Sequence, residues 1–558
     1  MKHKIKKLDI SLDSIFKLAD RCRENGDVMG ALRWVDKADR LFGIREDFDF
    51  IELLADVYEI AGITDSALRY WFLALDCCNE DELTDIYESL AVCFGVKGDK
   101  QTSDYYYEKM LRRMGWSRPE IESYLSGEPQ EEQSPKLFHR VFPPEKADYA
   151  EQIGKGLDFL RRGDFEKAEK EFDAVHPASK DGKRAGNFAA LSEIMQGRAS
   201  DAISRVQTLL SQDEDNLELL VTLGTAYRAN GEPEKGVPIA KELAKRDGLS
   251  NEEMLKVSSL LCELGLHSDV FEYARRMEKQ FAYDGNVLFM EGIAAINCGM
   301  EEEAKEVFDR LLTLYPDAAV VEYYLKAAEE GSISSASYLY RVPPEERQLR
   351  EEKLEELTEL TVSDLRNRYS AEMDEIEELF DWCFDEMDGQ DLRLQAIAVT
   401  LALNADAREY LEDLLLDYQV NDVIKTEVVR NLCIRNKECS LRIVVHNTYQ
   451  IVTLPTLHIG RKAHKKFMEG YALCMSHFGL RAEGLTELIP PIAGVLYGSL
   501  AEKNLLDEVD SAETVAASIC SLCGLHEEND ALRMLCLIVG ANYDKVFRFL
   551  EVYRGSEK

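Results

Sequence analysis

No part of the 558-residue sequence approaches the roughly 18 consecutive apolar residues that a membrane-spanning helix needs. The best apolar run, from Leu488 to Leu500, is too short and contains Pro490 and Pro491. The N-terminal residues are basic, but the alternating apolar and acidic residues that follow them are unlike the apolar core of a signal peptide. We therefore expect a cytoplasmic protein that does not associate with membranes.

The sequence also lacks the patterns that indicate catalysis or metal binding. Its 13 cysteines show no disulfide framework, which favours reduced and mostly buried thiols in a long chain. Cys520 and Cys523 form a CxxC pair with His526 nearby, but a zinc site needs four convergent ligands and a second strong pair is missing. Phosphate-binding glycine loops and nucleophile elbows are missing too. We expect no cofactor, no metal and no enzymatic activity.

Positive charge is scarce. The chain has 105 acidic and 67 basic residues, for a formal net charge of -38. Nucleic acid and anionic membranes repel such a protein as a whole, so the balance favours neutral or basic partners. Hydrophobic residues make up 45 % and charged residues 31 %, which is typical of a folded rather than a disordered chain.

What the sequence does contain is a regular spacing of glycine, which indicates an internal repeat. Five glycines follow one another every 34 residues, and three more lie upstream at intervals of 36 residues. They are Gly163, Gly197, Gly231, Gly265 and Gly299, and upstream Gly26, Gly62 and Gly98. Five positions after most of them stands a small residue such as Ala168 or Ala304.

This period predicts pairs of antiparallel helices. Glycine provides the backbone freedom with which the first helix of a pair, helix A, turns into the second, helix B. Small residues let the two helices approach, and larger ones such as Phe308 fill the gap to the next pair. The pattern resembles the tetratricopeptide repeat (TPR) over more than half of the chain. The family spacing is clearest at Gly292, Ala295, Gly299, Ala304, Phe308, Leu311 and Pro316.

The resemblance implies an all-α, TPR-type helical solenoid that binds other macromolecules. Breaks in the pattern, rich in proline, divide it into two arrays followed by a helical domain. We expect a first array of three repeats over residues 10–125, a linker over 126–146 and a second array of about five repeats over 147–330. A linker or helix over 331–360 then leads to a C-terminal helical domain over 361–558.

In this family ligands lie on the concave surface, which helix A lines. The resemblance places fifteen residues of the first array there, and nine of them are acidic, against about 2.8 expected from 105 acids in 558 residues. The nine, which we call the acidic groove, are Asp13, Asp20, Glu24, Asp49, Glu52, Asp56, Glu59, Asp85 and Glu88. The other six are Phe16, Arg23, Ile60, Val92, Gly95 and Val96.

Two interpretations of the acidic groove stay open. It holds a basic peptide or the basic face of a protein by charge complementarity, or it is a solvated face in which acids favour first helical turns. Members of the family that bind chaperone C-terminal tails have Lys and Asn at these positions. The Asp and Glu residues here speak against that activity.

The second array offers a more apolar concave surface. It either receives an amphipathic helix or packs against neighbouring parts of the same chain, and we favour self-packing. The concave residues are Glu218, Val221, Thr225, Arg228 and Ala229 in repeat 217–250, and Asn286, Phe289, Ile293, Ile296 and Asn297 in repeat 285–318.

The C-terminal third keeps helical periodicity but loses the 34-residue spacing. Residues 391–436 are weakly similar to HEAT-type helical pairs. Residues 441–454 are rich in β-branched side chains around His446 and Asn447, which predicts a β-hairpin. Such a hairpin is either half of a winged helix or a decoration on the solenoid.

Basic residues gather in this third of the chain. Between residues 425 and 481 stand ten basic residues and only three acidic ones. Nine of them, which we call the basic island, are Lys425, Arg430, Arg435, Lys437, Arg442, Arg461, Lys462, Lys465 and Lys466. The island contacts phosphates, docks on a protein surface that includes the chain's own acidic groove, or is solvated.

The sequence thus favours a scaffold or adaptor whose acidic groove captures a basic protein. The alternative is a regulator that contacts nucleic acid through residues 425–466 or through the terminal helices. In those helices Cys536, Gly540 and Val546 have spacings compatible with a helix-turn-helix, with Lys545 and Arg548 on its second helix.

Overall fold

A computed structural model describes residues 11–45, 47–125, 149–385, 391–435, 438–457, 464–481, 484–525 and 529–556. The chain forms two compact units, one from Met1–Gly127 with Pro344–Lys558 and the other from Glu128–Pro343. The predicted linker over 126–146 lies outside the described residues.

The first array consists of three antiparallel helix pairs and a short final helix, as the repeat pattern predicts. The helices are α1 (Leu12–Glu24), α2 (Val28–Phe42), α3 (Phe48–Ile60), α4 (Thr64–Cys77), α5 (Leu83–Val96), α6 (Lys100–Arg113) and α7 (Arg118–Leu125). Each helix A packs on its own helix B, and each B on the next A. The chain enters α6 through Asp99, whose carboxylate accepts a hydrogen bond from the Thr102 amide.

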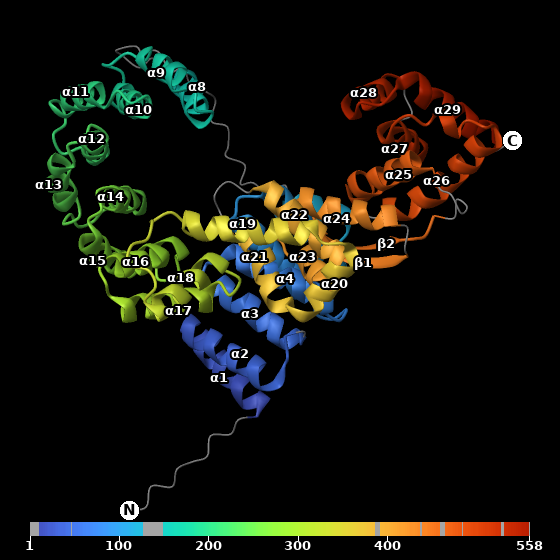
Figure 1. Cartoon of the computed structure of the whole chain (residues 1–558), viewed down its shortest axis with the longest axis horizontal. Coiled ribbons are helices and arrows are strands. Elements are labelled where there is room, and N and C mark those ends of the chain that lie inside the picture. Colours follow the sequence, from blue (N-terminus) through green and yellow to red (C-terminus); the bar gives the residue numbers. More distant parts are fainter. Residues whose placement is uncertain are drawn as a thin grey trace, which may run out of the picture. The chain divides into compact units, whose positions relative to one another are not determined.

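The second array continues the same architecture with five pairs and one further helix. Its helices are α8 (Ala150–Arg161), α9 (Phe165–Asp173), α10 (Gly182–Met195), α11 (Ala199–Leu210), α12 (Leu217–Ala229), α13 (Pro233–Leu243), α14 (Asn251–Glu263), α15 (His267–Met277), α16 (Gly285–Asn297), α17 (Glu301–Leu314) and α18 (Ala319–Glu330). In Figure 1 these pairs follow one another along a curved path, coloured from cyan to yellow-green.

The regularly spaced glycines lie at the turns where helix A passes into helix B. Gly163 and Gly299 have φ values of 77° and 70°, in the left-handed region that side chains disfavour. The other six also have positive φ. The predicted reason for the glycine period is therefore confirmed.

The core of each pair is built from small residues facing large ones. Ala168, Ala202 and Ala304 are completely buried between their helices. A Cβ atom on Gly292 would lie 2.5 Å from the ring of Phe308, so only glycine allows this approach. The helices meet because the facing side chains interlock, which is the source of stability in repeat proteins.

The C-terminal part is helical apart from one antiparallel hairpin. Its helices are α19 (Pro344–Glu359), α20 (Val362–Ala371), α21 (Met373–Asp385), α22 (Leu392–Ala405), α23 (Arg408–Leu416), α24 (Asp422–Arg435), α25 (Lys465–His477), α26 (Leu485–Glu502), α27 (Ala512–Cys520), α28 (Asn529–Val539) and α29 (Tyr543–Ser556). The hairpin consists of β1 (Cys439–Val445) and β2 (Thr448–Leu454), with Val445 opposite Thr448.

The hairpin prediction is confirmed, and β1 begins two residues before the predicted start. His446 and Asn447 form its two-residue turn with φ values of 52° and 57°, as a type I′ hairpin turn requires. The two polar residues that predicted the turn from the sequence therefore also adopt the backbone conformation that the turn requires.

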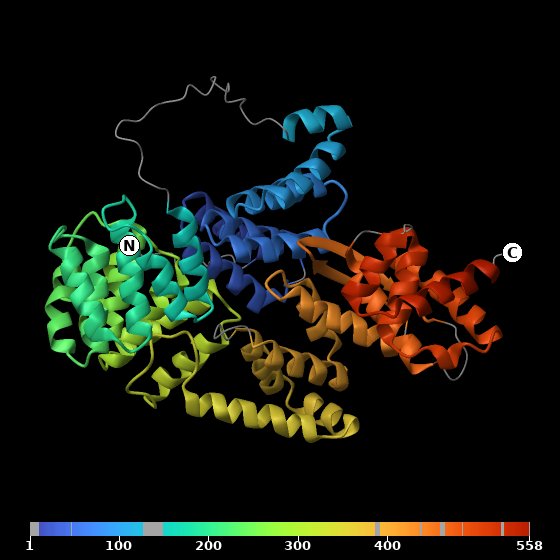
Figure 2. The same ribbon diagram turned by 90° about the horizontal axis from the view of Figure 1, so that it is seen from above.

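An aromatic cluster joins the first array to the C-terminal part within one compact unit. Tyr418, between α23 and α24, stacks on Phe72 of α4 with ring centroids 5.8 Å apart. It meets Phe94 of α5 edge-on at 5.9 Å. The Tyr106 hydroxyl of α6 donates to the Asn447 carbonyl at 2.8 Å. Figure 2 shows the hairpin, in orange, beside the blue helices of the first array.

Candidate peptide-binding surfaces

The acidic groove lies on α1, α3 and α5, the three A helices of the first array. The framework positions that the repeat register assigns to the interior are buried or half-buried, including Ile15, Tyr58 and Phe94. The nine acidic residues are exposed or half-buried. The register predicted from the repeat therefore orients these helices correctly.

One arginine neutralises part of the acidic groove. Arg23 of α1 lies 3.1 Å from the Asp20 carboxylate and forms a second ion pair with Asp56 of α3. The indole N–H of Trp71 donates to Glu59 at 3.0 Å. At the outer end, Asp13 pairs with Lys17 at 2.7 Å. The pair between Arg23 and Asp56 ties the first repeat to the second. The acids around Glu52 on α3 and α5 form the rest of the groove.

Burial and repulsion raise the pKa of the Glu52 carboxyl above the ordinary glutamate value. Burial is the larger cause, and four neighbouring carboxylates add to it. The repelling carboxylates are those of Asp49 and Asp56 on α3 and of Glu82 and Asp85 at the start of α5. Burial also raises the pKa of Asp56, against the opposing charge of Arg23. A cation placed here gains from all of these groups at once.

Apolar side chains accompany the acids on the same surface. Ile60, Val92 and Val96 belong to the fifteen concave positions and are exposed, Val96 to 73 %. They stand at the C-terminal halves of α3 and α5. The surface therefore offers carboxylates and apolar contacts together, which matches a segment that is both basic and apolar.

The basic island does not form one exposed surface. Lys425 is 1 % exposed, and its ammonium donates to the Val444 carbonyl at 2.6 Å. Burial lowers the pKa of Lys425 to about 8, against the attraction of Asp417 and Asp422. Lys425 therefore holds α24 to the hairpin and is not available to phosphates or to a partner. The sequence of α24 did not show this, because its apolar residues do not mark one face: Val423 and Ile434 are exposed.

The other described members of the island have partners within the chain. Arg435 donates to the Leu403 carbonyl at 2.7 Å, and Lys466 to the Asp510 carbonyl at 2.6 Å. Arg430 lies 3.4 Å from Glu427, and Lys465 lies 3.8 Å from Glu469. Lys437, Arg461 and Lys462 lie outside the described residues.

Arg442 links the island to the first array. Its guanidinium lies 2.7 Å from the Asp76 carboxylate of α4. The Tyr449 hydroxyl of β2 donates to the same carboxylate at 2.7 Å. The island thus reaches an acid of the first array, but Asp76 stands on a B helix and not in the acidic groove.

The two basic residues of the terminal helices are also paired. Lys545 lies 2.8 Å from Asp510, and Arg548 lies 2.6 Å from Glu508. Gly540 turns the chain between α28 and α29 with a φ of 74°. The helix pair predicted from the spacing exists, with its basic side chains directed to acids of the same unit.

Two of the concave residues of repeat 285–318 contact the segment that follows the array. We call residues 332–343 the strap. Phe289 packs on Tyr340 with ring centroids 4.9 Å apart, and Asn297 makes two hydrogen bonds with the Ala336 backbone. The predicted self-packing is confirmed for Phe289 and Asn297. Sequence reasoning did not name Tyr338 and Tyr340, although two tyrosines two positions apart in a serine-rich segment were the available signal.

The two charged concave residues of repeat 217–250 take part in ion pairs between repeats. Glu218 pairs with Lys256 of α14, and Arg228 lies 3.3 Å from Glu263. These residues hold adjacent repeats together.

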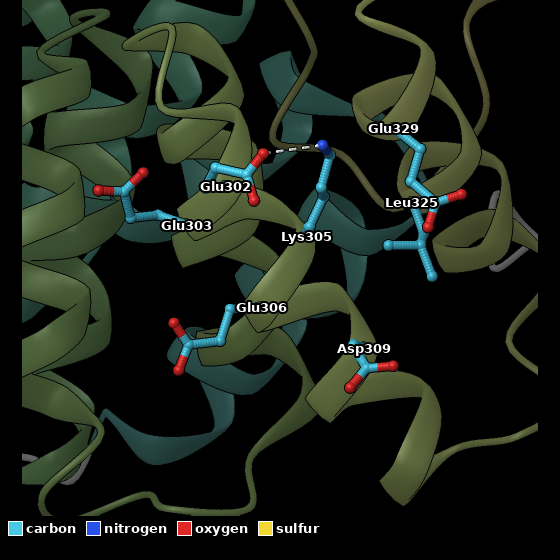
Figure 3. A pocket seen from close by; sticks show the side chains of 7 residues that line it. All are labelled: Glu302, Glu303, Lys305, Glu306, Asp309, Leu325 and Glu329. Atoms are coloured by element: carbon cyan, nitrogen blue, oxygen red, sulfur yellow. Dashed lines mark hydrogen bonds and ion pairs between the residues drawn. The ribbon is translucent and has the colours of Figure 1, made fainter.

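A shallow pocket of about 550 Å³ lies between α17 and α18. Five carboxylates and one ammonium line it together with Leu325, and Lys305 pairs with Glu302 at 3.1 Å (Figure 3). In Figure 3 the carboxylates point in different directions and do not converge on one point. The pocket has no arrangement that a catalytic pair or a cation requires.

The cysteines of the CxxC pair lie on α27 and in the turn after it. Burial raises the pKa of Cys520 to about 12 and that of Cys523 to about 11, so both are thiols at neutral pH. His526 lies outside the described residues. Among the residues that the structure describes, no group of three or more His, Cys, Asp and Glu side chains is placed to hold a metal ion.

Within the described ranges, the helices are all too short or too polar to cross a bilayer.

No family model and no curated protein matches the sequence. Similar solved structures include a tetratricopeptide repeat protein from Parabacteroides merdae, with 14 % identity, a TM-score of 0.21, and coverage of 57 % of this chain and 98 % of that one. Yeast Tom70 is 11 % identical with a TM-score of 0.19, over 98 % of this chain and 96 % of its own. Such weak similarity carries no argument about function, and the repeat architecture rests on the helix pairs and glycine turns. Stacked repeats of this kind present extended concave surfaces for binding.

Proposed function

We propose that the protein is a non-enzymatic scaffold whose first array holds a basic partner segment in the acidic groove. The observation that carries this proposal is the clustering of acids around Glu52, where burial and four neighbouring carboxylates raise the pKa of its carboxyl group. Such mutual repulsion is relieved when a ligand supplies positive charge. The exposed Ile60, Val92 and Val96 add apolar contacts for the same segment.

The chemistry defines the partner as an amphipathic segment with lysine or arginine along one side and aliphatic residues along the other. Half-exposed ion pairs are worth about 0.5 kcal/mol each. Three of them together change an affinity by roughly tenfold, since 1.4 kcal/mol corresponds to a factor of ten. The proposal therefore predicts moderate affinity that falls with salt.

The test uses the full-length chain and a labelled helical peptide of lysine and leucine. The variant carries Glu52→Gln, Asp85→Asn and Glu88→Gln. A matched control removes three carboxylates from the second array through Glu302→Gln, Glu303→Gln and Glu306→Gln. We expect the groove variant to bind roughly tenfold more weakly and the control to bind as the wild type does. Equal losses in both variants would show that only net charge matters.

Contact with nucleic acid through the basic island is the less supported function. Lys425 is buried, and Arg435, Arg442, Lys466, Lys545 and Arg548 contact groups of the same chain. Phosphate binding would have to displace those contacts. Salt-dependent binding of a labelled single-stranded oligonucleotide would support nucleic-acid contact, provided that the Lys465→Glu variant loses it.

A further inference from the structure

The strap begins where α18 ends. Gly331 terminates α18 with a φ of 61°, and the Ser332 amide donates to the Ala327 carbonyl. Residues 332–343 then contain no helix or strand. They contact side chains of α15, α16 and α18, within the same compact unit. The strap is thus a segment without regular secondary structure laid on a helical-repeat surface, as a bound peptide would be.

Asn297 of α16 recognises the strap through its backbone. Its side-chain amide donates to the Ala336 carbonyl at 2.9 Å, and its carbonyl accepts from the Ala336 amide at 2.7 Å. An amide side chain that pairs with the N–H and the C=O of one residue binds the peptide backbone, whatever side chain that residue carries. This contact is therefore not specific to the strap.

Two aromatic side chains provide the specificity. The Tyr338 ring stacks on His267 with centroids 5.8 Å apart, and its hydroxyl lies 2.8 Å from the imidazole Nδ1. The Tyr340 ring packs against Phe289 at 4.9 Å. The chain bends at residues 338–341, where the Arg341 amide donates to the Leu339 carbonyl at 2.9 Å. Ala336, Tyr338 and Tyr340 each contact the array.

The strap is held more loosely than the array beneath it. Leu339 is 56 % exposed, and Ser332, Ser334, Ser335 and Ser337 are exposed. Its firm attachment is at the C-terminal end, where Val342 is buried and the Tyr324 hydroxyl donates to the Arg341 carbonyl at 2.9 Å. Segments with few buried contacts open locally at low cost. The strap can therefore leave its seat without unfolding the repeats.

We propose that the seat formed by His267, Phe289 and Asn297 is a second binding site, for a non-helical peptide with two aromatic side chains two positions apart. The strap is the chain's own occupant of that seat, and a partner peptide of this pattern displaces it. Because the strap is covalently attached, its local concentration is high, and it suppresses weak competitors. This site lies in a different unit from the acidic groove, so the test of one proposal does not decide the other.

The test measures binding of a labelled peptide with the sequence of residues 332–343 to the full-length chain. The strap variant carries Tyr338→Ser and Tyr340→Ser, which empties the seat. We expect this variant to bind the peptide at least about tenfold more tightly than the wild type, because the attached competitor is removed. Adding Asn297→Ala should abolish that gain, and a peptide with both tyrosines replaced by serine should not bind.

Absence of binding to a strap variant that melts like the wild type would overturn the proposal, and so would binding that survives Asn297→Ala. Hydrogen exchange of the wild-type chain provides a second measurement that needs no variant. We expect the Ala336 amide to exchange faster than the interior amides of α16. Equally slow exchange would show that the strap is a permanent part of the fold.

Discussion

Arg442 of the hairpin and Asp76 of α4, separated by 366 positions in the sequence, form an ion pair at 2.7 Å. The Asp76 side chain is only 8 % exposed and also accepts from Tyr449. Tyr418 and the hairpin pack on α4, α5 and α6 of the first array, so the repeats that carry the acidic groove belong to one unit with the C-terminal part.

Asp76→Ala should destabilise that unit by about 2 kcal/mol, because it removes the acceptor of the Tyr449 hydroxyl and the closer of the two acids beside the Arg442 guanidinium. Chemical unfolding of the full-length chain measures the effect. Asp36→Ala is the matched control, since Asp36 pairs with Arg40 on an exposed helix face. Its cost should stay below about 0.5 kcal/mol. Equal effects of the two substitutions would show that the contacts of Asp76 stabilise the unit no more than an exposed ion pair does.

Substitution of one of the regularly spaced glycines tests why glycine recurs at the turns of the repeat. Gly163→Ala should cost about 1–2 kcal/mol, because alanine disfavours a φ of 77°. Gly154→Ala, inside the neighbouring α8, meets no atom within 4 Å and should stabilise by up to about 1 kcal/mol. Thermal unfolding compares the two. A loss at Gly154 as large as at Gly163 would refute the assignment.

The buried ammonium of Lys425 makes stability depend on pH in the alkaline range. The pKa of Lys425 is about 8 in the folded chain and 10.5 for an ordinary lysine. Between these values the unfolded chain binds more protons, so the free energy of unfolding rises with pH. The rise should amount to roughly 2–3 kcal/mol and should disappear in Lys425→Met. An unchanged slope in the variant would show that other groups cause it.

Binding of a basic segment to the acidic groove should be linked to proton release. Burial and repulsion raise the pKa of Glu52 in the free protein, and a bound cation lowers it again. Affinity should therefore increase as pH rises through the region just above the ordinary glutamate range, and it should level off at neutral pH. In Glu52→Gln this dependence should weaken. Titrations between acidic and neutral pH measure it, and a flat profile in the wild type would argue against the groove.

Much of the fold was predictable because the repeat is a local pattern. The glycine spacing predicted the turns at Gly163 and Gly299, and the polar pair His446 and Asn447 predicted the hairpin turn. These features depend on backbone preferences of nearby residues.

What could not be predicted depends on contacts between distant residues. Nothing in a helical pattern indicates that Tyr418 would cover Phe72, or that the carbonyl of Val444 would accept from a buried Lys425. The basic island was likewise defined by position in the sequence, whereas its described members contact partners on different elements. The site under the strap was predicted only as self-packing of the second array. The role of Tyr338 and Tyr340 became clear from the structure, in which Asn297 binds the backbone of the segment between α18 and α19.

The most direct measurement of the central claim is the location of a bound basic segment. A helical peptide of lysine and leucine that carries one photoreactive residue would be cross-linked to the full-length chain, and the attachment sites would be mapped by mass spectrometry. The account predicts attachment on α3 and α5, near Glu52, Glu88 and Val92, with loss of these products at high salt. Attachment confined to other acidic surfaces, such as Glu302 and Glu306 on α17, would contradict it.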